Sequence, residues 1–327
     1  MTVDLLIIGQ GLCGTFLSLE AQRAGRTFHV VDAFRPSSAS RVSAGVLNPV
    51  TGKRLVRTWM ADKLLPYAEK AYRLAGEAWG VDCIREVPIV QFFKDEAERD
   101  LFENKRALGP VHPTGPPAAN FFHPYGYGII QPAYVTDVPG LLCAARRDLA
   151  ARDLLEEDVV RDDDLLVRPD HIRWKNVLAR YAVFCDGVSV AARTWFTGWP
   201  FAAGKGEALV VEVPGLSPDA VYKHDSLTIV PRAGGDFWVG ASHEWTFEND
   251  LPSAAFRSKT EAHLRTWLRV PFRTLNHVAS VRPCTQDRRP LVGVHPLYPT
   301  LAILGGMGTK GGGMAPYFAR ELVARLF

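Results

Sequence analysis

At the start of the chain, the pattern of apolar and polar positions changes from that of a strand to that of a helix and back again. Residues 3–8 (VDLLII) form a short apolar run rich in branched side chains, which predicts a strand buried on both faces. Residues 15–24 carry apolar side chains at helical spacing and stop at Gly25, a residue that commonly follows the end of a helix. Residues 28–31 predict a second strand. The pattern therefore predicts a strand–helix–strand unit.

A glycine motif joins the first of these strands to the helix. Gly9, Gly11 and Gly14 follow the spacing GxGxxG, and Asp32 ends the second strand. Gly9 permits a tight turn, Gly11 lets the backbone approach a pyrophosphate, and Gly14 lets the helix pack closely on the strand. The N–H groups at the helix start favour phosphate, and Asp32 is placed to accept hydrogen bonds from a ribose. These features predict a site for the ADP half of NAD or FAD.

A second glycine-rich segment lies near the other end of the chain. Residues 301–304 (LAIL) predict a buried strand, and residues 305–313 hold six glycines in nine positions. Glycine forfeits side-chain burial and costs backbone entropy, so we expect a loop here, followed by a helix over residues 317–326. The loop suits contact with a flat ligand, and a helix start with Lys310 nearby would stabilise a reduced flavin. Nicotinamide dehydrogenases need only the first motif, so the two together favour FAD.

Several segments, in the same order, resemble the FAD-dependent D-amino-acid oxidase family, which includes glycine oxidase and sarcosine oxidase. They are residues 38–49 (SASRVSAGVLNP), 206–207, 229–242, 282–293 and 306–316. The resemblance covers nearly the whole chain. It implies an α/β fold in which a Rossmann-like FAD-binding domain of the glutathione-reductase type joins a mostly antiparallel substrate domain. We expect residues 1–58, 130–200 and 275–327 in the first domain, and residues 59–129 and 201–274 in the second.

The resemblance also implies which residues hold FAD. They come from the two glycine segments and from the serine- and alanine-rich stretch beneath the flavin: Gly9, Gly11, Leu12, Cys13, Gly14, Asp32, Ala33, Ser40, Arg41, Ser43, Ala44, Gly45, Val160, Gly187, Gly306, Met307, Gly308, Thr309, Lys310 and Gly311. Some relatives attach the flavin covalently near Cys284. The spacing from Cys284 to Asp287 differs from theirs, so we expect non-covalent FAD.

The activity implied by the resemblance is oxidation of the C–N bond of an amino acid or secondary amine by hydride transfer to flavin N5. Arg282 is the candidate ligand for a substrate carboxylate, because a guanidinium binds that group with two parallel hydrogen bonds. An ion pair with Asp287 is the structural alternative. Asn48 and Lys310 complete the candidate catalytic residues. Several relatives place a tyrosine on the substrate hairpin, where this chain has Leu227 and Thr228.

Composition narrows the choice of partners. The chain has 327 residues and a formal net charge of +3, and its basic residues are scattered, which does not indicate nucleic-acid binding. The five cysteines and nine histidines show no metal-ligand spacing, and no run of eighteen apolar residues predicts a membrane span. We therefore expect a cytoplasmic enzyme that acts on a small amine or amino acid without a metal. The oligomeric state is not indicated.

Two alternatives stay open. The first is an oxidase domain that modifies the wobble uridine of tRNA, since residues 308–316 (GTKGGGMAP) fit that class. The second is a flavin-binding subunit without turnover of its own that passes electrons to a partner. The electron acceptor is not indicated by the sequence.

Overall fold

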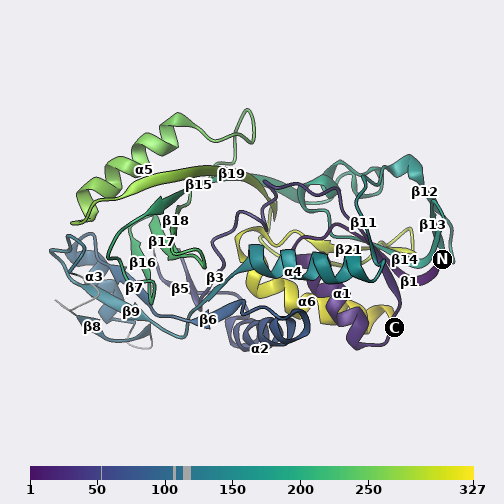
Figure 1. Ribbon diagram of the computed structural model, residues 1–327, viewed down its shortest axis with the longest axis horizontal. Coiled ribbons are helices and arrows are strands. Elements are labelled where there is room, and N and C mark those ends of the chain that lie inside the picture. The colour runs from purple at the N-terminus through teal and green to yellow at the C-terminus, as the bar shows by residue number, and fades with distance from the viewer. Residues whose placement is uncertain (53, 106–107, 113–118) are drawn as a thin grey trace.

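An eight-stranded mixed sheet lies at the end of the molecule that holds both chain termini (Figure 1). The computed structural model describes residues 1–52, 54–105, 108–112 and 119–327. Five parallel strands form the centre of this sheet, in the order β11, β2, β1, β14 and β21, and antiparallel strands flank them. The strands are β1 (Thr2–Ile8), β2 (Phe28–Val31), β11 (Leu155–Glu156), β12 (Leu165–Val167), β13 (Ile172–Trp174), β14 (Val177–Phe184), β20 (Leu291–Val294) and β21 (Leu301–Gly305).

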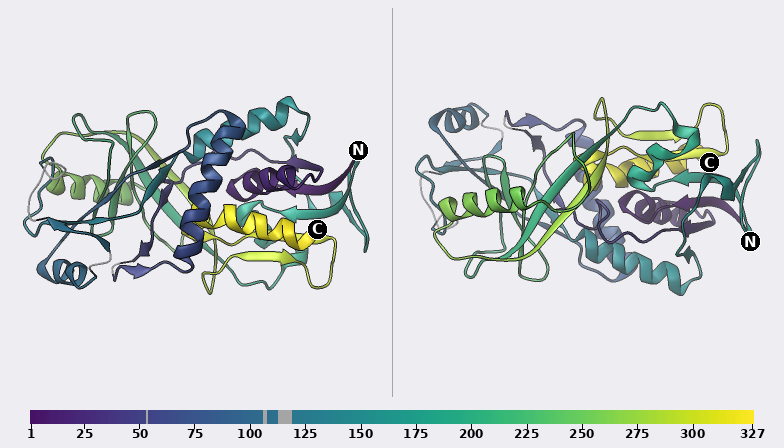
Figure 2. Two further views of the ribbon diagram at one scale, coloured as in Figure 1. Left: turned by 90° about the horizontal axis from the view of Figure 1, so that it is seen from below. Right: turned by 90° about the horizontal axis from the view of Figure 1, so that it is seen from above.

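Helices cover one face of the mixed sheet. They are α1 (Leu12–Arg23), α2 (Ala61–Trp79), α4 (Val138–Ala151) and α6 (Gly311–Leu326), and their apolar side chains form one core with strands β1 and β2. Figure 2 shows α2, in dark blue, lying across the middle of the molecule. Tyr72 of α2 lies in this core, and Trp59, just before α2, stacks on Phe318 of α6, so α2 packs against α6.

The other end of the molecule is built on a second eight-stranded sheet. Every neighbouring pair of its strands is antiparallel except β16 with β7. In order they are β19 (Arg273–Thr285), β15 (Phe201–Glu212), β18 (Phe237–Gly240), β17 (Leu227–Pro231), β16 (Val221–His224), β7 (Ile89–Phe92), β9 (Tyr127–Ile130) and β8 (Val111–His112). Helix α5 (Ala254–Trp267) covers one face of this sheet (Figure 1).

Small elements join the two sheets. They are β3 (Val46–Leu47), β10 (Tyr134–Thr136) and β6 (Ile84–Glu86) in one short sheet, and β4 (Val50–Thr51) with β5 (Val56–Arg57). Helix α3 (Glu96–Glu103) lies at the far end of the antiparallel sheet, near β9 (Figure 1). The expected α/β fold, with one mixed and one mostly antiparallel sheet, is confirmed. The residue boundaries of the two domains stay a prediction. Within the described ranges, no helix combines the length and apolar character that crossing a membrane requires.

Both predicted helices begin earlier than expected. Helix α1 begins at Leu12, so Gly14 lies inside its first turn. Helix α6 begins at Gly311, and three residues of the predicted glycine loop belong to it. A Cβ atom on Gly312 would lie 2.9 Å from the Leu47 Cδ2 atom. Close packing on β3 therefore favours glycine at this helix start. Helix propensity alone would predict no helix here, because glycine is a poor helix former.

Candidate functional site

A cavity of about 800 Å³ runs from the mixed sheet to the antiparallel sheet. The carboxyl ends of β1, β2, β14 and β21 all open onto it, which is where open α/β sheets bind ligands. Both glycine segments line it, although nearly three hundred positions of sequence separate them. The volume falls in the range of roughly 300–1,000 Å³ that ligand pockets occupy.

The cavity brings together nearly all of the residues that the sequence assigned to FAD. Its wall includes Gly9, Gly11, Leu12, Cys13, Asp32, Ala33, Ser40, Arg41, Ser43, Ala44, Gly45, Val160, Gly187, Gly306, Met307, Gly308, Thr309, Lys310 and Gly311. Gly14 is not part of the wall. A Cβ atom there would lie 1.8 Å from the Gly9 carbonyl oxygen, so glycine is needed at this position for the packing of helix on strand.

The first glycine turn is tied to the serine-rich stretch by a hydrogen bond at the start of α1. Gly9 has φ +103°, and a Cβ atom on it would lie 2.6 Å from the Cys185 carbonyl oxygen. The Leu12 N–H at the start of α1 donates to the Ser40 hydroxyl at 3.1 Å. A hydroxyl that accepts this bond keeps its own proton for a phosphate oxygen. The turn and the serine-rich stretch thus offer donors to one pyrophosphate.

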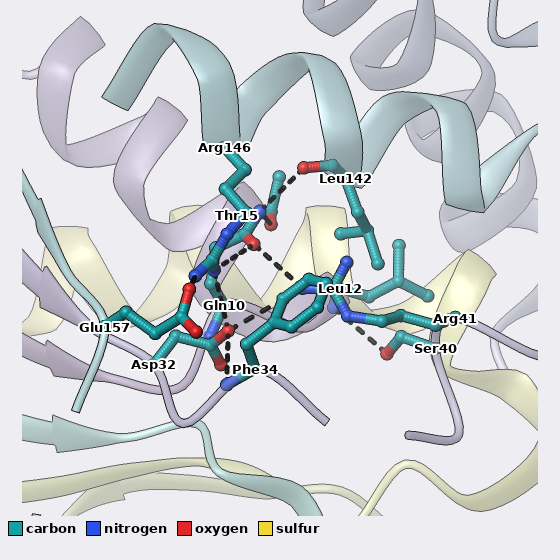
Figure 3. Close-up of polar contacts among 10 residues, drawn as sticks. All are labelled: Gln10, Leu12, Thr15, Asp32, Phe34, Ser40, Arg41, Leu142, Arg146 and Glu157. Carbon is teal, nitrogen blue, oxygen red and sulfur yellow. Dashed lines mark hydrogen bonds and ion pairs between the residues drawn. The ribbon is translucent and has the colours of Figure 1, made fainter. Parts of the chain in front are cut away.

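Asp32 lies at the centre of a polar cluster at this end of the cavity (Figure 3). One carboxylate oxygen accepts the Gln10 N–H at 2.9 Å, and the other accepts the Phe34 N–H at 3.2 Å. Arg146, which reaches in from α4, donates to the second oxygen at 2.9 Å, and Arg41 lies 3.6 Å from it. These contacts fix the direction in which Asp32 faces the cavity.

Two arginines and an aromatic ring complete this cluster. The guanidinium carbons of Arg41 and Arg146 each lie 4.6 Å from the centre of the Phe34 ring, and both groups donate to the buried Gln10 side chain. The sequence analysis assigned a role to Asp32 and Arg41 but not to Gln10, Phe34 or Arg146. Arg146 and Asp32 are 114 positions apart, so no local pattern could have paired them.

The C-terminal glycine segment forms the opposite wall. Gly306 has φ +68°, and a Cβ atom on it would lie 2.8 Å from the Thr285 methyl group. The chain then makes a short 3₁₀ turn over Gly308–Lys310 before α6 begins. The first residues of α6 therefore present backbone N–H groups and the positive end of a helix dipole to the cavity.

Lys310 and Asn48 meet inside the cavity. The Lys310 ammonium donates to the Asn48 side-chain oxygen at 3.1 Å. Burial lowers the pKa of Lys310 to about 8, and the positive charge of Lys223 adds to this effect. Lys223 was not among the residues expected from the sequence. It lies on β16, and burial also lowers its pKa.

Arg282 lies on β19, with its guanidinium across the backbone of β15. Its Nη1 and Nη2 atoms each donate to the Ser242 carbonyl oxygen at 3.2 Å, and Nη1 also donates to the Lys205 carbonyl oxygen at 3.4 Å. A Cβ atom on Gly206 would lie 1.8 Å from Nη2, so only glycine leaves room for this guanidinium. In the part of the chain that the structure describes, no carboxylate forms an ion pair with Arg282, Asp287 included.

The hairpin of β17 and β18 contributes no tyrosine to the cavity. Thr228 faces the cavity on β17, whereas Leu227 packs in the core under α5. Tyr222 lies on β16, is buried in the same core and donates to the Ser217 carbonyl oxygen at 2.9 Å. Trp238 on β18 donates to the Val42 carbonyl oxygen at 3.1 Å and so ties the serine-rich stretch to the sheet.

The thiols near the cavity are held in their protonated form. Cys13 and Cys185 line the cavity, and burial raises the pKa of Cys13 to about 12 and that of Cys185 well above its usual value. Cys284 is buried on β19, and its pKa is also raised by burial. Protonated thiols are weak nucleophiles. Among the described residues, no group of three or more His, Cys, Asp or Glu side chains is arranged to hold a metal ion.

Comparisons with known proteins agree with this geometry. The family model described as FAD dependent oxidoreductase (DAO) matches residues 4–325. Glycine oxidase from Geobacillus kaustophilus is similar in structure, with a TM-score of 0.78 and 20% identity over 99% of this chain and 94% of that one. Iminodiacetate oxidase from Chelativorans sp. BNC1 has a TM-score of 0.80 and 18% identity over 98% of this chain and 95% of that one.

A third similar structure is L-proline dehydrogenase from P. horikoshii, with a TM-score of 0.76 and 13% identity over 98% of this chain and 93% of that one. At these sequence identities the solved structures show only that the fold is shared, whereas the family model shows that the chain is a member of the family. The proteins of this family depend on FAD, so the protein is an FAD-dependent enzyme. The chain belongs to the DAO family of FAD-dependent oxidoreductases.

Proposed function

We propose that this enzyme oxidises the C–N bond of an amino acid or secondary amine. The observation that carries the proposal is Arg282, a guanidinium without a carboxylate partner in the described structure, which faces the same cavity as the C-terminal glycine segment. Bound FAD would supply the hydride acceptor, at its N5 atom. The substrate would lose a hydride from carbon to the flavin and a proton from nitrogen to water, which gives an imine. Water then converts the imine to a carbonyl compound and ammonia, or a free amine where the substrate is a secondary amine.

The residues present fit non-covalent FAD. The N–H groups at the start of α1, with the Ser40 hydroxyl, would bind the pyrophosphate, and the Asp32 carboxylate would accept hydrogen bonds from the adenosine ribose. The start of α6 would face the isoalloxazine. Non-covalent binding is supported by the raised pKa values of Cys13 and Cys185, which keep both thiols unreactive.

Arg282 would orient the substrate. The hydrogen bonds to Ser242 and Lys205 use its Nη atoms, and no hydrogen bond from Nε is present in the described ranges. The Nε edge is therefore available for side-on binding of a carboxylate through two parallel hydrogen bonds. Fixing the carboxylate fixes the neighbouring carbon, which is the positioning that hydride transfer requires.

The names of similar proteins support this reaction class. Glycine oxidase, iminodiacetate oxidase and L-proline dehydrogenase are named for amino-acid or amine substrates. No contact in the cavity specifically favours the two alternatives, tRNA modification and a subunit without turnover. The cytoplasmic location stays a prediction from the sequence.

An anaerobic absorbance titration of the purified yellow protein tests the proposal. A panel of free amino acids and amines is added, and we expect at least one amino acid to bleach the absorbance of oxidised flavin. Bleaching by a free amino acid would argue against both alternatives. A spectrum that no member of the panel changes would contradict amine oxidation.

The role of Arg282 is tested with the variant Arg282→Ala. We expect its kcat/KM to fall far more for amino acids than for the matching amines that lack the carboxylate. The control is Arg232→Ala, because Arg232 is exposed on the turn between β17 and β18 and does not line the cavity. Equal losses for both kinds of substrate would exclude Arg282 as the carboxylate ligand.

A further inference from the structure

Lys223 stands in a row of residues that crosses the floor of the cavity. In the sheet register, Lys223 faces Thr228, Thr228 faces Gly240, Gly240 faces Ala208, and Ala208 faces Val278. All five line the cavity. The opposite face of these strands packs under α5. The Lys223 side chain therefore belongs to the cavity and not to the outer surface of the sheet.

Lys223 and Arg282 occupy opposite sides of this floor. The Arg282 guanidinium lies over β15, and β18 and β17 separate that strand from β16, which carries Lys223. Three strand spacings amount to about 14 Å between the two backbones. Thr228, Gly240 and Ala208 lie between them and line the cavity. The Trp238 ring covers Gly240, with its Cη2 atom 2.9 Å from where a Cβ atom would lie, so the ligand has to pass over this ring.

The Lys223 ammonium has no counter-ion at contact distance. No ion pair within 4.0 Å and no hydrogen bond involves its Nζ atom within the described part of the chain. The charges of Glu98 and Asp225 raise its pKa from a greater distance, but burial is the larger effect and lowers it. The Lys223 side chain is half-buried, and a bound anion would offset the cost of holding its charge partly away from water.

Lys310 lines the same cavity from the C-terminal glycine segment, where its ammonium donates to the Asn48 side-chain oxygen, and it adds a second positive charge. At this end of the cavity, the described acidic residues that line it do not form ion pairs with Lys223 or Lys310. The Glu207 carboxylate accepts hydrogen bonds from Ser253 at the start of α5, at 2.6 and 2.8 Å, and Asp250 is exposed. The substrate end of the cavity is therefore cationic at both sides.

We propose that Lys223 binds a second anionic group of the substrate, so that the preferred substrates are amino acids or amines with two carboxylates. This inference rests on the proposed amine oxidation. Arg282 holds the carboxylate next to the oxidised carbon, Lys223 holds the distal carboxylate, and Lys310 adds positive charge between the floor and the C-terminal glycine segment.

Binding of inert carboxylates to the holoenzyme tests this assignment without turnover. The probes are glutarate and butyrate, which differ by one carboxylate, and Kd is measured by calorimetry. We expect glutarate to bind more tightly to the wild type. Lys223→Met should weaken glutarate by about 10- to 150-fold, the range for losing a hydrogen bond to a charged group, and butyrate by less than about 2-fold.

Two further variants make the test specific. Lys223→Arg keeps the charge and should retain the preference for glutarate. Lys259→Met is the matched control, because Lys259 is exposed on α5 and outside the cavity, and we expect it to change neither affinity. Equal wild-type affinities for the two probes, or equal losses in Lys223→Met, would overturn the assignment. Where Lys223→Met does not fold, equal wild-type affinities for the two probes would still overturn the assignment.

The anaerobic reduction assay separates this inference from the proposed function. Amino dicarboxylates should reduce the flavin with a higher kcat/KM than neutral amino acids of the same length. Reduction by neutral amino acids with no preference for diacids would keep amine oxidation and overturn the role of Lys223. A glutarate site that depends on Lys223, in a protein that no amine reduces, would keep the anion site and overturn amine oxidation.

Discussion

Gly206→Ala tests whether the position of the Arg282 guanidinium, and not only its charge, determines substrate binding. The new Cβ atom would lie 1.8 Å from Nη2 and 2.1 Å from Cζ. Real Cβ atoms do not approach neighbours within 3.0 Å, so the guanidinium must retreat by at least 1.2 Å. It is the far end of a flexible side chain, so we expect it to move while the strand stays in place.

The movement sets the size of the effect. Retreat of the guanidinium breaks the 3.2 Å hydrogen bonds to Ser242 and displaces the bound carboxylate. A displacement of about 1 Å can cost roughly 100-fold in rate where a reacting carbon must be held in place. We therefore expect kcat/KM for a carboxylate-bearing substrate to fall by about 100-fold, with no change in bound FAD.

Stopped-flow reduction of the flavin under anaerobic conditions measures this loss. Gly204→Ala is the matched control, because Gly204 lies on the same strand and the nearest atoms to its new Cβ would be 3.6 Å away. The matching amine without a carboxylate should reduce the flavin equally well in the wild type and in both variants. An unchanged kcat/KM in Gly206→Ala would refute the placement of the substrate carboxylate on Arg282.

Three other changes probe the rest of the cavity. Arg146→Met removes the 2.9 Å contact that orients Asp32 and should weaken FAD binding about 10-fold, measured by the fluorescence of released FAD; unchanged affinity would contradict the role of this contact. Gly312→Leu should lower the free energy of unfolding by about 1–3 kcal/mol, measured by chemical denaturation. Gly313→Leu should not lower it, because a Cβ atom on Gly313 meets nothing within 4 Å. Equal effects of the two substitutions would contradict the close packing of Gly312 on Leu47. Lys310 has a pKa lowered to about 8, so it is charged below that pH, and the affinity for glutarate should fall as the pH rises through about 8. In Lys310→Arg the side chain stays charged, so its affinity for glutarate should not fall over this pH range. A wild-type affinity that is independent of pH would contradict a contribution of Lys310 to anion binding.

The parts of the site that the sequence could predict are local. The strand–turn–helix of residues 2–23 is encoded by apolar periodicity and by glycine spacing within one short segment, and each glycine has a steric reason in the structure. The same applies to the strand before the C-terminal glycines. For these segments, the pattern of apolar residues and glycines is enough to predict the structure, because the residues in contact lie close together in the sequence.

The parts that could not be predicted depend on distant contacts. Helix α6 begins at Gly311, and Gly312 in its first turn packs closely on Leu47, a contact on which residue propensities contain no information. Arg146 reaches Asp32 from another helix. Alternation along β16 places Lys223 and Tyr222 on opposite faces, but only the three-dimensional structure shows which face borders the cavity.

A crystal structure of the purified yellow protein tests the central claim most directly, which is that one FAD extends between the two glycine segments. We predict the adenosine ribose against Asp32, the pyrophosphate at the start of α1, and the isoalloxazine beside Lys310 and the start of α6. A flavin whose ring lies away from residues 306–311, or an FAD bound outside this cavity, would contradict the account.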